Sequence, residues 1–168
     1  FDDEGVLSKK NEIIKGGILN TYLTNKEAAK YFGLKNTGNA RSAFWNQPSF
    51  IRMTNTYLES GKKKVEDLIS QVNYGYYICD TVKNGRCKPD GTFEINASNA
   101  LVLEKGNIVG RLKNIQLIGD IFLIFNRFYE IGNDTKLCLG TSKCGKYSSI
   151  KVDAGGPHVL TECYLKIG

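Results

Sequence analysis

The chain has 168 residues, of which 41% are hydrophobic and 24% charged, a composition typical of one globular domain. Its longest apolar run, residues 121–125, is far shorter than the roughly 18–20 residues that span a bilayer, so we expect no membrane-embedded segment. Lys and Arg outnumber Asp and Glu by 23 to 17, but the densest basic run, residues 62–64, has acidic neighbours and indicates a solvated face rather than a nucleic-acid footprint.

The first half of the chain predicts extended segments, one helix and a long loop. Residues 12–23 are apolar and interrupted by two glycines, which indicates extended chain around a bulge or turn. Thr24 is followed three residues later by a glutamate, a capping-box pattern, and Gly33 stands where a C-cap belongs, so we expect a helix over 25–32. Residues 34–50 show no sustained period and predict a long loop, which is often functional.

The second half predicts strands with two further helices. An apolar stripe of Val65, Leu68, Ile69 and Val72 predicts a helix over 64–73 that faces the core. The other expected elements are a hairpin of 76–82 with 92–98, strands at 100–104 and 107–117 around a turn at 105–106, a helix at 120–130, and two final strands at 148–155 and 158–167. The order of these strands and helices along the chain predicts an α+β fold, mostly antiparallel β-sheet with a few short helices.

The stretch LGTSKCGKYSS (139–149) is similar to a phosphate-binding loop, but Tyr147 takes the position of the required hydroxyl. The residues that follow are strand-like, so the helix that such a loop serves is missing, and we do not expect a nucleotide site. Cys144 lies between Lys143 and Lys146, and nearby positive charge favours a thiolate, which is a nucleophile or a metal ligand. From these residues alone, an incidental cysteine in a turn is the other interpretation.

The five cysteines of the chain are an odd number without a C-x-x-C pair. A disulfide framework in a small secreted domain is normally even and denser. We therefore expect reduced thiols in a cytoplasmic protein.

Several motifs in order resemble the C-terminal half of the TldD/PmbA family, which contains metallopeptidases and was historically labelled as modulators of DNA gyrase. They are FDDEGV (1–6), GILNTYLTNKEAAKYFG (17–33), NTGNAR (36–41), RMTNTYLESG (52–61) and CGKYSSIKVDAGGP (144–157). The arginine-methionine-threonine-asparagine stretch and the CGK segment look closer to the TldD branch than to the PmbA (TldE) branch.

In TldD-type members, the cysteine of the CGK segment joins two histidines of an HExxxH helix to bind zinc. The resemblance therefore implies that Cys144 is a metal ligand and that zinc is the cofactor of the full-length protein. This sequence has no HExxxH, and we interpret its one histidine, His158, as structural. We expect residues 1–168 to be a single domain, the C-terminal domain of a longer chain, with no catalytic residue of its own and no activity alone.

The resemblance also places four polar residues near a substrate cleft: Asn39, Arg41, Arg52 and Asn55. Peptides in such clefts are held by strand addition, and an arginine could bind a substrate carboxylate in a bidentate manner. The other interpretation is that the asparagines satisfy turn geometry and that the arginines pair with acids such as Asp2 or Asp3.

The function that the resemblance implies is zinc-dependent hydrolysis of unfolded or short peptides, with a PmbA-like or an identical subunit as partner. Two alternatives are a non-catalytic PmbA-like (TldE) scaffold subunit and a gyrase-associated regulatory protein. An HExxxH motif upstream would favour the enzyme, and salt-dependent binding to DNA would favour the regulator.

Overall fold

The computed structural model describes residues 1–79, 85–138 and 142–167. The chain divides into two compact units, which we describe one at a time: the first unit, Phe1–Leu58 with Lys136–Gly156, and the second unit, Glu59–Thr135 with Pro157–Gly168. The helices are short and most strand pairs are antiparallel, which confirms the α+β prediction. Within the described residues, no helix has the length and the apolarity needed to cross a bilayer.

The first unit begins with a small hairpin and a helix. Strands β1 (Ile14–Lys15) and β2 (Ile18–Leu19) pair around two glycines with positive φ, which confirms the expected turn. Helix α1 (Lys26–Phe32) ends at Gly33, whose left-handed conformation also agrees with the sequence. The expected N-cap was wrong by one residue. Asn25 caps the helix by accepting from the Ala28 N–H, because the Thr24 hydroxyl is turned inward to the Lys35 carbonyl and to Thr37.

The predicted loop over 34–50 contains two short strands that the sequence pattern did not reveal. β3 (Ala40–Arg41) and β4 (Phe50–Ile51) form an antiparallel pair that closes a loop over 42–49. Two residues each give too short a pattern for a strand to be recognised from alternation.

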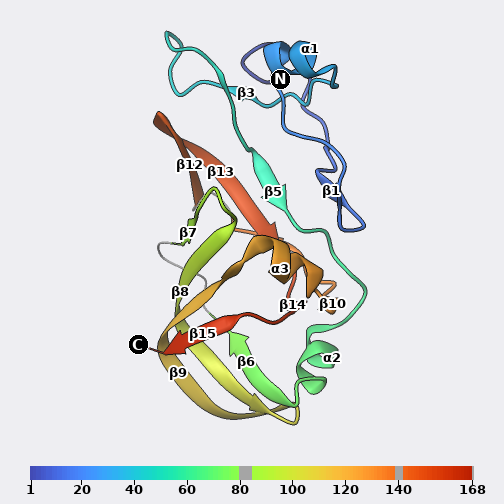
Figure 1. Cartoon of the computed structure of the whole chain (residues 1–168), viewed down its shortest axis with the longest axis vertical. Coiled ribbons are helices and arrows are strands. Elements are labelled where there is room, and N and C mark those ends of the chain that lie inside the picture. The colour runs from blue at the N-terminus through green and yellow to red at the C-terminus, as the bar shows by residue number, and fades with distance from the viewer. Residues whose placement is uncertain (80–84, 139–141, 168) are drawn as a thin grey trace. The chain divides into compact units, whose positions relative to one another are not determined.

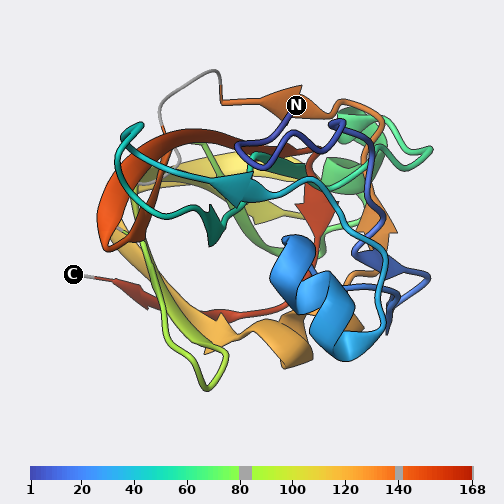
Figure 2. The ribbon, with the colours of Figure 1, turned by 90° about the horizontal axis from the view of Figure 1, so that it is seen from above.

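A four-stranded sheet completes the first unit. Its members are β11 (Lys136–Leu137), β12 (Ser142–Lys146), β13 (Ser148–Gly156) and β5 (Asn55–Tyr57). β13 pairs antiparallel with β11 and β12 and parallel with β5. Gly155 permits the close approach of β11, since a Cβ there would collide with the Lys136 carbonyl. In Figure 2 the cyan segment of β3 and β4 runs across the orange-red β12–β13 ribbon.

The second unit is built on a long antiparallel hairpin (Figure 1). Its elements are α2 (Val65–Ser70), β6 (Tyr74–Ile78), β7 (Arg86–Cys87), β8 (Thr92–Glu104), β9 (Asn107–Asp120), α3 (Ile121–Asn126), β10 (Glu130–Ile131), β14 (Val159–Leu160) and β15 (Tyr164–Ile167). The sheet order is β15-β9-β8-β6, with β7 also on β8, and β10 pairs with β14. A buried cluster of Ala97, Ala100 and Ile115 forms its core.

Helix α2 covers part of this sheet with the predicted apolar stripe. Leu68 is only 4% exposed, and it shares a small hollow of about 60 Å³ with Tyr76, Leu103 and Leu160. The prediction that this helix faces the core is therefore confirmed.

The sequence misjudged how the second unit pairs its strands. The expected hairpin of 76–82 with 92–98 is confirmed only in that β6 pairs antiparallel with β8. Its register is wrong, because Tyr76 lies opposite Val102, and residues 80–82 fall outside the described part. The turn at 105–106 is confirmed, but β8 is one continuous strand from 92 to 104. The helix expected over 120–130 has only six residues, and the final segment divides into β14 and β15.

Candidate functional site

Cys144 lies in the middle of strand β12, directly opposite Ile150 of β13. Its side chain is a half-buried, free thiol. The sequence placed this cysteine in a glycine turn, which is wrong: the chain reverses at Tyr147, whose positive φ of 59° marks the turn. Residues 139–141 of the same stretch, including the first glycine of the loop pattern, lie outside the described residues.

The backbone around this turn is held by one buried arginine. Arg52 is 2% exposed, and its Nη1 donates to the carbonyls of Cys144 at 3.0 Å and Ser148 at 2.9 Å. Nη2 donates to the Lys146 carbonyl and to the Ser148 hydroxyl. One guanidinium therefore bonds the chain on both sides of Tyr147.

Residues 50–53 make further contacts to the same two strands. The Lys146 ammonium donates to the Ile51 carbonyl at 3.3 Å, and the Phe50 and Tyr147 rings lie 4.9 Å apart. Arg41 Nη1 donates to the carbonyls of Met53 and Lys151, each at 3.1 Å. The β12–β13 turn is thus tied to this segment by several independent bonds.

Asn39 and Arg52 hold each other in place. The Arg52 N–H donates to the Asn39 carbonyl at 2.9 Å, and Asn39 Nδ2 donates to the Arg52 carbonyl at 3.0 Å. Within the described residues, Asn39 Oδ1 and Arg52 Nε are the buried side-chain polar atoms without a hydrogen-bond partner. Asn55, in contrast, is exposed on β5 opposite Asp153.

Arg41 and Arg52 thus bond the β12–β13 pair that carries Cys144, Asn39 is bonded to Arg52, and Asn55 lies on β5 beside β13. The acids near the chain start bind backbone instead of these arginines. Asp2 accepts from the N–H groups of Glu4, Val6 and Ala40, and Asp3 accepts from that of Ser42. Whether any of the four residues contacts a substrate stays a prediction.

Within the part of the chain that the structure describes, the donor set is compatible with one zinc ligand and not with a complete zinc site. Across residues 1–79, 85–138 and 142–167, no three His, Cys, Asp or Glu side chains gather as a metal-binding group. His158, in the second unit, has both ring nitrogens engaged, Nδ1 with Asp134 at 2.6 Å and Nε2 with the Tyr77 hydroxyl at 2.8 Å. A cysteine sulfur such as that of Cys144 is a common donor to zinc.

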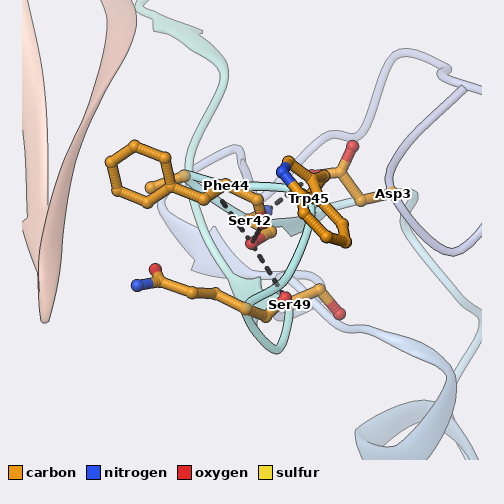
Figure 3. A pocket seen from close by; sticks show the side chains of 7 residues that line it. Asp3, Ser42, Phe44, Trp45 and Ser49 are labelled. Carbon is orange, nitrogen blue, oxygen red and sulfur yellow. Dashed lines mark hydrogen bonds between the residues drawn. The ribbon is translucent and has the colours of Figure 1, made fainter.

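The first unit also has an open hollow of about 400 Å³ on the loop between β3 and β4 (Figure 3). Ser42 Oγ lies within hydrogen-bonding distance of the carbonyls of Phe44 and Gln47, which shapes the loop. Trp45 is 97% exposed at this hollow. The loop follows directly after Arg41, and its exposed Phe44 and Trp45 are aromatic side chains close in sequence to the expected substrate residues.

Sequence reasoning missed the contacts of Arg52 with the β12–β13 turn. Its partners lie 92 to 96 residues further along the chain, so no local spacing could reveal them. The role of Ser148 as a hydroxyl partner also has no local signal.

The chain matches known proteins along nearly its whole length. The family described as PmbA/TldA metallopeptidase C-terminal domain matches residues 1–164. Relatives include a metalloprotease TldD homolog of Buchnera aphidicola subsp. Acyrthosiphon pisum, 36% identical over 96% of this chain and 34% of the relative. A zinc metalloprotease TldD homolog of Saccharolobus solfataricus is 32% identical over 100% of this chain and 37% of the relative. The chain thus spans about a third of the length of these relatives.

Solved structures show the same fold. TldE from Thermococcus kodakarensis superposes with a TM-score of 0.80 at 23% identity, over 99% of this chain and 36% of that one. A Thermotoga maritima protein, described as a candidate modulator of a DNA gyrase, gives 0.78 at 25% identity, over 99% and 35%. The order of motifs, the family match and the curated relatives agree, and the chain belongs to the TldD/PmbA metallopeptidase family, of which it matches the C-terminal domain.

Proposed function

We propose that this chain is the part of a TldD-type zinc metallopeptidase that supplies Cys144 as a zinc ligand and forms part of the peptide cleft. The observation that carries the proposal is a half-buried thiol on a strand whose backbone is bonded to a buried arginine. A relative that is named a zinc metalloprotease supports zinc as the cofactor of the full-length protein. The 168 residues then act as one domain of that longer protein.

The residues of this chain have two tasks in such a site. Cys144 donates its sulfur, and the bonds to the β12–β13 turn hold the strand from which that sulfur projects. When bound, zinc supplies a Lewis acid that polarises the scissile carbonyl and lowers the pKa of an attacking water. The histidines and the general base come from outside this chain, as the resemblance implies.

A peptide can reach Cys144 by adding to the sheet edge. β12 pairs with β13 on one side, and within the described residues it is the outer strand of the order β11-β13-β12. An extended peptide that adds to such an edge gains main-chain hydrogen bonds whatever its sequence. This supports unfolded or short peptides as substrates, with the exposed Asn55 and the partly exposed Arg41 as the candidates for direct contact.

The decisive experiment is Cys144→Ser in the full-length protein. We expect zinc affinity to fall by more than about 100-fold, beyond the loss seen when an outer-shell partner is removed, and peptide hydrolysis to fall with it. Zinc content after dialysis and turnover of an unfolded peptide measure the two effects. Cys87→Ser, at an exposed cysteine of β7, is the matched control and should change neither. A Cys144→Ser protein that retains zinc as tightly as the unmodified one rules the proposal out.

A second candidate function is the non-catalytic scaffold. The fold match to TldE is compatible with it, because a TldE-like chain has the same architecture, whereas the curated relatives are TldD homologs. A full-length chain with HExxxH that hydrolyses peptides decides for the enzyme, and one that only binds them decides for the scaffold. In both cases we propose a PmbA-like or identical subunit as partner, and a reducing, cytoplasmic location that keeps Cys144 a thiol.

A further inference from the structure

The side chain of Arg52 is a buried cation with neutral hydrogen-bond partners. Its guanidinium bonds to four neutral oxygens: the carbonyls of Cys144, Lys146 and Ser148 and the hydroxyl of Ser148. A buried charge is costly unless it is well hydrogen-bonded. The planar arginine fork can bond several acceptors at fixed angles, which a lysine ammonium cannot reproduce.

All four N–H groups on Nη1 and Nη2 have acceptors, and the remaining donor, Nε, is buried. This leaves no exposed donor for a substrate carboxylate. The base of the side chain is fixed as well, because Asn39 bonds the Arg52 backbone at both its N–H and its carbonyl. Arg52 therefore links one fixed segment rigidly to another.

We propose that Arg52 is a positioning residue for the Cys144 sulfur. The Cys144 carbonyl is one of its acceptors, so the guanidinium sets the peptide plane from which the cysteine side chain projects. The bonds to Lys146 and Ser148 prevent the turn from rotating about Tyr147. The inference rests on the proposed function, since it assumes that Cys144 binds the metal.

The test uses the full-length protein with Arg52→Lys, which keeps the charge but cannot reach all four acceptors. Cobalt(II) is substituted for zinc, and both its affinity and its thiolate-to-cobalt charge-transfer band are measured. We expect affinity to fall by about 10–100-fold, the range for partners that orient a ligand, and the band to weaken. These readouts report on the sulfur and not on turnover.

Thr24→Val is the control for lost stability. Thr24 is 1% exposed in the first unit, and its hydroxyl donates to Lys35 and contacts Thr37, but it has no bond to the β12–β13 turn. It should lower stability without changing the cobalt band. If Arg52→Lys does not fold, Ser148→Ala, which removes one acceptor, decides the question through an expected loss of roughly two- to tenfold.

The two proposals fail in different ways. If Cys144→Ser leaves cobalt affinity unchanged, the ligand assignment is wrong, and the positioning role falls with it. If Cys144→Ser abolishes tight binding while folded Arg52→Lys and Ser148→Ala bind like the unmodified protein, only the positioning role is overturned. A Thr24→Val protein that loses as much affinity as Arg52→Lys also overturns it, because general destabilisation would then explain both.

Discussion

His158 lies between a carboxylate and a phenol in the second unit. Its Nδ1 faces Asp134 and its Nε2 faces the Tyr77 hydroxyl, and the His158 and Tyr77 rings stack with their centroids 5.4 Å apart. Burial, followed by the charges of Cys79 and Asp134, raises the pKa of Tyr77, so the phenol keeps its proton and can donate it to Nε2. A proton on Nδ1 donated to Asp134, with the phenol donating to Nε2, satisfies both contacts. This arrangement suits a structural histidine.

The Asp134–His158 pair leads to a pH-dependent prediction. Burial raises the pKa of the Asp134 carboxyl, but hydrogen bonds from the His158 backbone N–H and ring outweigh this and hold the pKa below its ordinary 3.8. A carboxyl with a depressed folded-state pKa stabilises the fold above about pH 4, and this contribution is lost as pH falls through the folded pKa. Asp134→Asn should therefore cost about 1 kcal/mol at pH 7, with the difference shrinking below pH 4.

Urea unfolding at several pH values measures this effect. His158→Phe provides the matched background. It keeps a ring against Tyr77 but removes both ring nitrogens, Nδ1 that faces the Asp134 carboxylate and Nε2 that faces the Tyr77 hydroxyl. In that background Asp134→Asn should cost clearly less. An equal cost in both backgrounds, or a difference that grows in acid, would contradict the pairing.

At the residue scale, the resemblance predicts Cys144 as a metal ligand, which stays a prediction, but no sequence pattern shows which residues hold the Cys144 backbone. The resemblance supplied the cysteine because its CGK motif is local. The partners of Arg52 are distant along the chain, and the burial that makes its bonds necessary exists only after folding. His158 shows the same limit, since Asp134 and Tyr77 lie 24 and 81 residues away.

Among the elements, helix α1 shows how far local signals suffice. Its C-cap at Gly33 is visible in the sequence, and the structure gives this glycine the expected left-handed conformation. The N-cap was misassigned because Thr24 and Asn25 are both good caps, and only the inward bonds of Thr24 decide between them.

We predict that Asn25→Ala destabilises α1 by about 1 kcal/mol, because the Ala28 N–H loses the oxygen that accepts its hydrogen bond at 2.9 Å. Urea unfolding and the helical circular dichroism signal measure it. Asn25→Asp is the matched control, since it keeps an acceptor at the same place and adds a favourable charge at the helix start. Equal stability of the alanine and aspartate variants would show that this cap does not matter.

The strand pairings cannot be predicted from such local signals. The turn at Lys105 and Gly106 was predictable because glycine favours turns, and the backbone has positive φ at both positions. The pairing of β6 with the far half of β8, and the parallel contact of β5 with β13, join segments through long intervening chain. The register of β6 on β8 is set by which apolar residues reach the core, such as Ala100, and not by the turn residues.

At the scale of the whole molecule, the number of metal donors determines whether the chain can bind zinc tightly by itself. It contains one histidine, which is engaged with Asp134 and Tyr77, and it matches about a third of the length of its relatives. Tight zinc sites in proteins need three or four converging donors. The described residues offer Cys144 without two further donors beside it.

We therefore predict that the zinc affinity of the 168-residue chain is lower than that of the full-length protein by roughly several orders of magnitude. One thiolate supplies only a fraction of the binding free energy of a complete ligand set. Calorimetric titration of both proteins measures the difference. Cys144→Ser in the short chain should remove most of the weak binding that remains, whereas Cys87→Ser should not. The short chain should also show no peptide hydrolysis that a chelator abolishes. Chelator-sensitive turnover by these residues alone would mean that the ligands and the general base are all within this chain, and the division of the site proposed above would be wrong.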